Sequence, residues 1–135
     1  VQICTGDRCH LDAALVERAV AQIDTDGVDL LVIENVGNLV CPTAFDLGEH
    51  RRVAVLAVTE GEDKPLKYPA LFASADAVLI NKTDLAEVVE FDRSAALRHL
   101  QAVAPQAVVF EVSAISGEGL AAWIEWLDQS GGCKR

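Results

Sequence analysis

The sequence contains no methionine, few aromatic residues and about half as many basic as acidic side chains. Lysine and arginine number 11 against 21 aspartates and glutamates, which gives a formal net charge of −10. Binding to a nucleic-acid backbone or to an anionic membrane needs clustered basic residues, and the longest basic cluster here is Arg51-Arg52. The composition therefore excludes nucleic acid and anionic membranes as expected partners.

Long apolar runs and targeting segments are also missing. No run approaches the roughly 18 residues of a membrane-spanning helix, and no signal peptide opens the chain. We therefore expect a soluble, cytoplasmic protein. Val1 lies in a predicted strand and no initiator methionine precedes it, so we also expect an upstream segment.

The phosphate-binding motif Gly-x-x-x-x-Gly-Lys-Ser/Thr does not occur anywhere in the 135 residues. No lysine follows a glycine; the lysines are Lys64, Lys67, Lys82 and Lys134. The sequence therefore offers no backbone cradle of the usual kind for a β-phosphate and no motif lysine for a γ-phosphate.

The length predicts one domain over residues 1–128 and a flexible tail over residues 129–135. Hydrophobic residues make up 51% of the chain, which is enough for a core. The four cysteines favour metal or redox roles over disulfides in a cytosolic protein. Of these, Cys133 belongs to the polar tail, and Cys4 is expected to pack at a strand end.

Apolar runs alternate with segments of helical period, which predicts an α/β fold with a doubly wound, mostly parallel sheet. Ligands in such folds bind beyond the carboxyl ends of the strands. The predicted strands are Val1–Ile3, Leu30–Ile33, Val53–Val58, Ala77–Ile80 and Ala107–Val112. The predicted helices are Leu11–Ile23, Asp92–Val103 and Leu120–Leu127.

The segment Asn81-Lys82-Thr83-Asp84 follows one predicted strand and suits guanine recognition. The Asp84 carboxylate can accept hydrogen bonds from the ring N–H and the exocyclic amine of guanine, a pair of donors that adenine lacks. Asn81 can brace the loop, and the stem of Lys82 can cover the base. Ser113 and Ala114 follow the next strand, where a backbone N–H can meet the guanine oxygen. The alternative is an ordinary polar turn.

The turn Glu34-Asn35-Val36-Gly37 follows another predicted strand. Glu34 can hold a water molecule on Mg²⁺, and the Gly37 N–H can bind a γ-phosphate oxygen. The alternative is a simple exit from the strand. The charged segment from Thr59 to Pro69 is too polar for a core. It could contact nucleotide phosphates, a partner subunit or a client protein, and the residues alone do not distinguish these three.

Cys9, His10 and Cys41 provide thiolate and imidazole groups, which suit Zn²⁺ or Ni²⁺. Three such donors leave a coordination shell incomplete, so a site completed across a symmetric dimer is natural. Cys41 lies four residues after Gly37, so movement of that turn would reach a metal ligand. Each cysteine taken singly has a simpler interpretation as a small buried hydrophobe.

These motifs resemble HypB, the nickel-incorporation GTPase family of hydrogenase maturation. The resemblance covers the Cys-His pair, the run from Ile33 to Pro42, the charged segment, the Asn-Lys-Thr-Asp loop and the run from Val112 to Leu120. It implies a P-loop NTPase fold of the SIMIBI type, here truncated at its N-terminus, with residues 1–128 as a GTPase-like domain.

The resemblance implies GTP hydrolysis with Mg²⁺, and delivery of Ni²⁺ to a [NiFe]-hydrogenase large-subunit precursor together with a partner metallochaperone. It implies a homodimer with Ni²⁺ or Zn²⁺ on Cys9, His10 and Cys41 at its interface. It also implies that Glu34 and Gly37 act at the Mg²⁺ and phosphate side. Asn81, Lys82 and Asp84, with Ser113 and Ala114, would bind the guanine of GTP or GDP.

Two departures from the family pattern bear on function. Ala14 stands where some members carry a further histidine, which disfavours a second metal. Because the phosphate loop is absent, we expect inefficient GTP hydrolysis by this polypeptide alone. The alternative function is a non-enzymatic, metal-binding dimerisation module, and a weaker one is a nickel-insertion GTPase for urease or another metalloenzyme.

Overall fold

The computed structural model describes residues 1–4, 10–35, 37, 39–40 and 46–130. The chain divides into an N-terminal unit, Val1–His50, and a C-terminal unit, Arg51–Arg135. Each unit is described by itself. Among the described residues, no helix is long and apolar enough to cross a membrane.

The C-terminal unit is built on a sheet of three parallel strands, β1 (Val53–Ala57), β2 (Ala77–Asn81) and β3 (Val108–Glu111), in that order. The three strands agree with the sequence prediction to within one residue at each end. Short apolar runs bounded by polar turns are typical of strands buried on both faces. Strand β2 is buried or half-buried along its length, whereas Val55 of β1 and Val108 of β3 are exposed.

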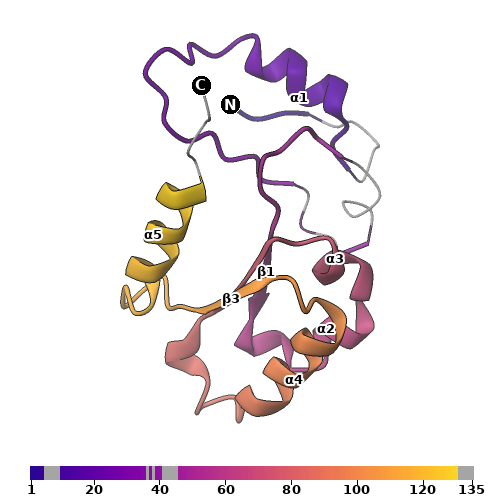
Figure 1. The fold of residues 1–135 in the computed structure, drawn as a ribbon, viewed down its shortest axis with the longest axis vertical. Coiled ribbons are helices and arrows are strands. Elements are labelled where there is room, and N and C mark those ends of the chain that lie inside the picture. The colour runs from indigo at the N-terminus through magenta and orange to yellow at the C-terminus, as the bar shows by residue number, and fades with distance from the viewer. Residues whose placement is uncertain (5–9, 36, 38, 41–45, 131–135) are drawn as a thin grey trace. The chain divides into compact units, whose positions relative to one another are not determined.

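One face of this sheet carries the core. Ala54, Val78 and Val109 are in register across the strands, and they pack with Phe72 and Leu100. Helices α3 (Pro69–Ala73) and α4 (Arg93–Val103) supply Phe72 and Leu100 to this core, and helix α2 (Lys64–Lys67) contacts both of these helices (Figure 1). Full burial of a side chain such as Phe72 contributes roughly 1.5–3 kcal/mol.

Helix α5 (Leu120–Ser130) contacts the other face of the sheet through Phe110 of β3. Phe110, in register with Leu79 and Val55, meets the ring of Trp123 edge to face at 5.6 Å between centroids. Trp126 stacks on Trp123 at 5.4 Å. Helices therefore contact both faces of the parallel sheet, which confirms the doubly wound fold, while Val55 on the α5 face is 52% exposed. Helix α5 extends two residues into the segment expected as a tail, and residues 131–135 lie outside the described part.

The N-terminal unit contains helix α1 (Ala13–Val20). Asp12 caps this helix by accepting a hydrogen bond from the Leu15 N–H at 2.8 Å, which places its start two residues later than the sequence predicted. The last expected residues form a turn instead, because the Ile23 N–H bonds to Val20 O rather than to the residue four earlier. Asp92 caps α4 in the same way.

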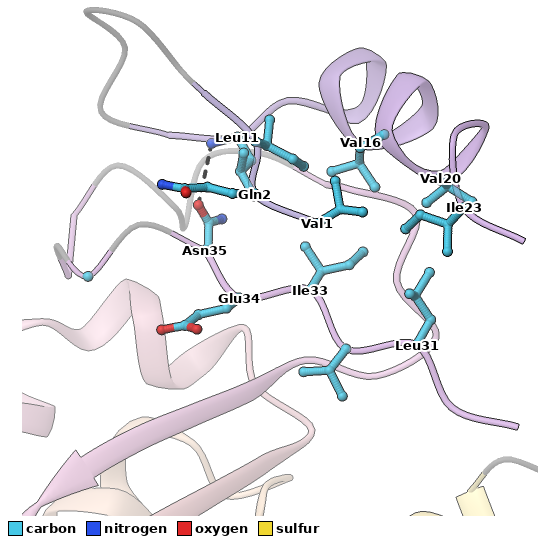
Figure 2. A pocket seen from close by; sticks show the side chains of 14 residues that line it. Val1, Gln2, Leu11, Val16, Val20, Ile23, Leu31, Ile33, Glu34 and Asn35 are labelled. Atoms are coloured by element: carbon cyan, nitrogen blue, oxygen red, sulfur yellow. Dashed lines mark hydrogen bonds between the residues drawn. The ribbon is translucent and has the colours of Figure 1, made fainter. Parts of the chain in front are cut away.

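The predicted strands Val1–Ile3 and Leu30–Ile33 are wrong, because the structure assigns no strand to these described residues. Their apolar residues favour burial, which is why a strand was predicted. A strand also needs a neighbouring strand to which its backbone can hydrogen-bond. Both segments instead line a hollow of about 720 Å³ together with the apolar face of α1, including Val16 and Val20 (Figure 2).

Candidate functional site

Three segments follow the strands of the C-terminal unit at the same edge of the sheet. They are the 3-10 helix η2 (Val58–Glu60) after β1, the 3-10 helix η3 (Thr83–Leu85) after β2, and residues 112–119 after β3. Residues 81–85 are called the base loop, and residues 113–119 the serine loop. The carboxyl edge of a parallel sheet is the usual place for ligands, and the predicted guanine-binding residues all lie here.

Asn81 ties the two loops together. Its Oδ1 accepts hydrogen bonds from the Lys82 N–H at 2.7 Å and from the Ala114 N–H at 3.2 Å. Lys82 has a left-handed backbone with φ 63° and ψ 36°, a conformation that costs a residue other than glycine roughly 1–2 kcal/mol. The side-chain oxygen of Asn81 therefore stabilises a strained residue and joins it to the serine loop.

Asp84 is oriented by a buried serine. The Ser113 hydroxyl, which has no solvent exposure, donates a hydrogen bond to Asp84 Oδ1 at 2.6 Å. The Ser116 N–H in turn donates to Ser113 Oγ at 3.2 Å. Asp84 is itself exposed, and no described residue donates to its Oδ2. Among the residues that the structure describes, Ser113 thus donates to one carboxylate oxygen of Asp84 and none donates to the other.

The backbone N–H groups of the serine loop are largely engaged within the protein. The Ser113 N–H donates to Glu118 O at 3.0 Å, and the Gly117 N–H donates to Ser113 O at 2.8 Å. The Ala114 N–H bonds to Asn81, so the donors expected to meet a guanine oxygen already have partners. Among the described residues, no acceptor is found for the Ile115 N–H.

Gly119 makes the closest backbone approach in this site. A Cβ atom added there would lie 2.0 Å from the carbonyl oxygen of Glu111, and Gly119 has φ +73°. Only glycine fits this position without displacing the end of β3. The C-terminal end of the serine loop therefore lies directly against the end of β3.

The two loops enclose a hollow of about 250 Å³. Its walls come from both loops and are formed by Asn81, Lys82, Asp84, Leu85, Ala114 and Ile115. The structure thus brings together four of the five residues predicted for guanine, with Ser113 directly behind Asp84. It adds Leu85 and Ile115, which the motif did not indicate. Their sequence signal is an aliphatic residue inside an otherwise polar or small-residue loop.

The charged segment after β1 lies beside the base loop, because η2 contacts η3. The segment is held by its own ion pairs: Lys67 Nζ lies 2.7 Å from Asp63 Oδ2. This hydrogen bond lowers the pKa of the Asp63 carboxyl below its ordinary value and raises the pKa of Lys67. The carbonyl of Glu62 also bonds to the His99 ring at 2.8 Å.

The N-terminal unit contains the other predicted site residues. Glu34 and Gly37 are exposed, and both line the 720 Å³ hollow. A Cβ at Gly37 would meet nothing within 4 Å. Between them, Asn35 Oδ1 accepts a hydrogen bond from the Leu11 N–H at 3.3 Å (Figure 2). The predicted phosphate-side turn is therefore bonded directly to the residue after His10.

Of the three predicted metal ligands, only His10 lies in the described part, where it is half-buried. Cys9 and Cys41 lie outside the described residues. Within the described ranges, no group of three or more His, Cys, Asp or Glu side chains is placed to hold a metal ion. Cys4 is exposed with a free thiol rather than packed at a strand end. The metal site stays a prediction from the sequence.

Known proteins with similar sequences identify the family of this chain. Residues 1–111 match the family model described as CobW/HypB/UreG, nucleotide-binding domain. Hydrogenase maturation factor HypB of Azotobacter vinelandii is 54% identical over 134 residues, covering 99% of this chain. The chain spans only 44% of that relative's length.

Two solved structures are also similar. The crystal structure of hydrogenase maturation factor HypB from Archaeoglobus fulgidus has a TM-score of 0.88 and 42% identity, covering 94% of this chain and 67% of that one. HypB from Helicobacter pylori in complex with nickel has a TM-score of 0.92 and 40% identity, covering 97% of this chain and 63% of that one.

Proposed function

Because the chain belongs to the CobW/HypB/UreG family, and within it to HypB, we propose that it is part of a GTP-dependent nickel metallochaperone. In this proposal the protein reads guanine with Asn81, Lys82 and Asp84. It helps to insert nickel into a [NiFe]-hydrogenase large-subunit precursor in the cytoplasm, as a homodimer, together with a partner metallochaperone. The relatives support this role, since they are hydrogenase maturation factors and one is a complex with nickel.

The observation that carries the proposal is the oriented carboxylate of Asp84. With Oδ1 held by Ser113, the carboxylate keeps a fixed direction at the mouth of the 250 Å³ hollow. Guanine presents two adjacent N–H donors that such a carboxylate accepts, and adenine presents no such pair. Lys82 can lay its methylene stem over the base while its ammonium group stays in water.

The coupling between nucleotide and metal is supported by the contact between Asn35 and Leu11. We propose that Glu34 acts on the Mg²⁺ side through a bound water, and that the Gly37 N–H meets a γ-phosphate oxygen; these would be the groups that take part in hydrolysis. Bound Mg²⁺ would neutralise developing phosphate charge, and an exposed carboxylate such as Glu34 is a suitable oxygen donor for it. Movement of this turn would reach His10 through Asn35 and Leu11.

The proposed metal ligands are Cys9, His10 and Cys41, holding Ni²⁺ as cargo or Zn²⁺ in its place. Thiolate and imidazole groups suit both ions. Three ligands from one chain leave room for ligands from a second copy, which is why we propose the dimer interface as the site.

A second candidate is a metal-binding dimerisation module without nucleotide turnover. One sequence observation favours it for these 135 residues taken by themselves: they contain no Gly-x-x-x-x-Gly-Lys-Ser/Thr motif. A chain that binds Ni²⁺ as a dimer, but does not distinguish guanine from adenine, would support this second candidate over the first.

The test is a base-exchange experiment on Asp84. GMP, AMP and XMP are titrated into the 135-residue chain by ligand-observed NMR, so that binding depends on the base rather than on the phosphate loop. We expect the wild type to prefer GMP. We expect Asp84→Asn to weaken GMP about tenfold or more, since a charged hydrogen-bond pair contributes roughly 1.5–3 kcal/mol, and to favour XMP, whose C2 carbonyl accepts from the new amide.

Asp128→Asn is the matched control, because Asp128 is an exposed aspartate of α5 outside the site. It should leave all three affinities unchanged. Equal binding of GMP and AMP by the wild-type chain would refute guanine recognition by this site.

A further inference from the structure

Arg93 is a basic residue in the first turn of α4, where the helix dipole favours an acidic one. The N-terminal end of a helix has a partial positive charge, so a cation there is disfavoured. Asp92 caps this end by accepting a hydrogen bond from the Ala95 N–H at 2.8 Å, and the first turn contains no acidic residue. A cation placed against the dipole indicates a partner outside the helix.

That partner is Glu111, the last residue of β3. Arg93 Nε donates to Glu111 Oε2 at 2.5 Å, and Arg93 Nη2 donates to Glu111 Oε1 at 2.6 Å. These hydrogen bonds raise the pKa of Arg93 above its ordinary value. Because two parallel bonds match the planar guanidinium group to the carboxylate, they fix direction as well as distance. The ion pair therefore joins the start of α4 to the end of β3.

Glu111 lies next to the groups that hold both loops of the candidate site. Its carbonyl oxygen is the atom that Gly119 approaches most closely, at the end of the serine loop. The following residue, Val112, accepts a hydrogen bond from the Thr83 N–H of the base loop at 3.2 Å. Ser113 then begins the serine loop. A shift of Glu111 would therefore reach both loops.

The ion pair closes a ring of contacts through the two loops. On one side, the base loop leads through residues 86–92 to Arg93, and the serine loop follows Glu111. On the other side, the hydrogen bond from Ser113 to Asp84 joins the loops at 2.6 Å. Neither Arg93 nor Glu111 lines the 250 Å³ hollow. The pair can therefore act on a bound base only through the loops.

We propose that Arg93 is a positioning residue for the guanine site: by holding Glu111, it sets the direction of the Asp84 carboxylate. This inference rests on the proposed function, since it concerns how the same carboxylate is aimed. Exposed ion pairs contribute little to the stability of a fold, and the side chain of Arg93 is 63% exposed. A hydrogen bond, in contrast, weakens steeply when its angle is poor. Loss of the pair should therefore change base preference more than stability.

The experiment measures that preference with nucleotides that differ at the edge of the base. GMP, IMP and AMP are titrated by ligand-observed NMR into the full 135-residue chain and into Arg93→Gln, and the thermal unfolding midpoint of each is recorded. IMP lacks only the exocyclic amine of GMP, so the ratio of their affinities measures the second hydrogen bond to Asp84. We expect the wild type to prefer GMP over IMP about tenfold or more.

Arg93→Gln should reduce the preference for GMP over IMP about threefold or more, because the carboxylate loses its fixed direction. The unfolding midpoint should change little. Arg93→Lys, which keeps the charge but not the planar pair of donors, should retain more of the preference than Arg93→Gln.

Two further variants show whether the pair acts as a unit. Glu111→Gln should reduce the preference as much as Arg93→Gln, and the double variant should lose no more than either, since each single change already breaks the pair. Arg98→Gln is the matched control, because Arg98 is an exposed arginine of the same helix for which no ion pair is found among the described residues. It should keep the wild-type preference.

The results that would overturn this inference are distinct from those that would overturn the proposed function. An unchanged ratio of GMP to IMP affinity in Arg93→Gln refutes the positioning role while guanine recognition stands. Equal weakening of GMP and IMP with a lowered unfolding midpoint reduces the pair to a structural one. An equal loss of preference in Arg98→Gln would show a general effect of charge. If the wild type binds no GMP, or binds GMP and AMP equally, both proposals are refuted.

Discussion

Replacing Gly119 by alanine should destabilise the C-terminal unit strongly. The added Cβ would lie 2.0 Å from the Glu111 oxygen and 3.0 Å from its carbonyl carbon. Both atoms belong to the backbone at the end of β3, so no flexible side chain can turn away. The loop or the strand must move by more than 1 Å to restore an ordinary carbon–oxygen contact of about 3.3 Å or more.

Two terms add in this substitution. A left-handed backbone such as the φ of +73° at Gly119 costs alanine roughly 1–2 kcal/mol. Forcing a methyl group into a filled site costs about 1–3 kcal/mol more. The sum of about 2–5 kcal/mol is a large part of the 5–15 kcal/mol that typically separates a folded domain from its unfolded chain.

Gly117 offers a matched control in the same loop. It has a similar φ of +83°, but a Cβ there would meet nothing within 4 Å. Gly117→Ala therefore carries only the backbone term of roughly 1–2 kcal/mol. The difference between the two variants isolates the contact with Glu111.

The assay is urea unfolding followed by the fluorescence of Trp123 and Trp126, which both lie in the C-terminal unit. Gly119→Ala should lose at least 1 kcal/mol more than Gly117→Ala, or fail to fold where Gly117→Ala folds. Equal losses for the two variants would show that the close approach to Glu111 is relieved without cost, and would refute the reasoning.

Two further predictions concern contacts outside the 250 Å³ hollow. Asn35→Ala should leave the buried Leu11 N–H without its side-chain acceptor and raise the hydrogen-exchange rate of this amide about fivefold, the equivalent of about 1 kcal/mol. An unchanged exchange rate would mean that the hydrogen bond contributes nothing to stability. Asn35→Asp, which keeps an acceptor, is the control. Asp63→Asn should flatten the dependence of stability on pH in the acidic range. The pKa of Asp63 is lowered in the folded state, so its contribution is fully present above the ordinary aspartate value of about 4 and is lost as the pH falls below that value through the lower folded-state pKa. Thermal unfolding from pH 6 to pH 3 checks this, and the same slope in wild type and variant would contradict it.

The sequence predicted the three paired strands because their apolar runs are short and bounded by polar turns. It was wrong about Val1–Ile3 and Leu30–Ile33 for a physical reason. Hydrophobic pattern reports which residues favour burial, whereas a strand also depends on a neighbour that one sequence window does not contain. Helix α1 was predicted in place but too long, since the cap at Asp12 sets its start.

The guanine motif predicted which residues gather at the sheet edge, because the ends of adjacent parallel strands meet there. It did not predict how they are held. The bond from Ser113 to Asp84 and the approach of Gly119 to Glu111 depend on distances across the chain that no local pattern contains. Ile115 was not predicted as a lining residue because its place in the hollow depends on its exposure, which hydrophobicity alone does not reveal.

The left-handed backbone at Lys82 has a kinetic consequence. The base loop is shaped before any ligand arrives, and its strain is compensated within the folded protein by hydrogen bonds such as that from the Lys82 N–H to Asn81. Association with a base would then need no slow rearrangement of this loop, so variants of the loop should differ mainly in dissociation rate. Glycine at position 82 would remove the backbone strain and so increase the stability of the fold. It would also remove the long side chain that is proposed to cover the base, so the residence time of the ligand would fall.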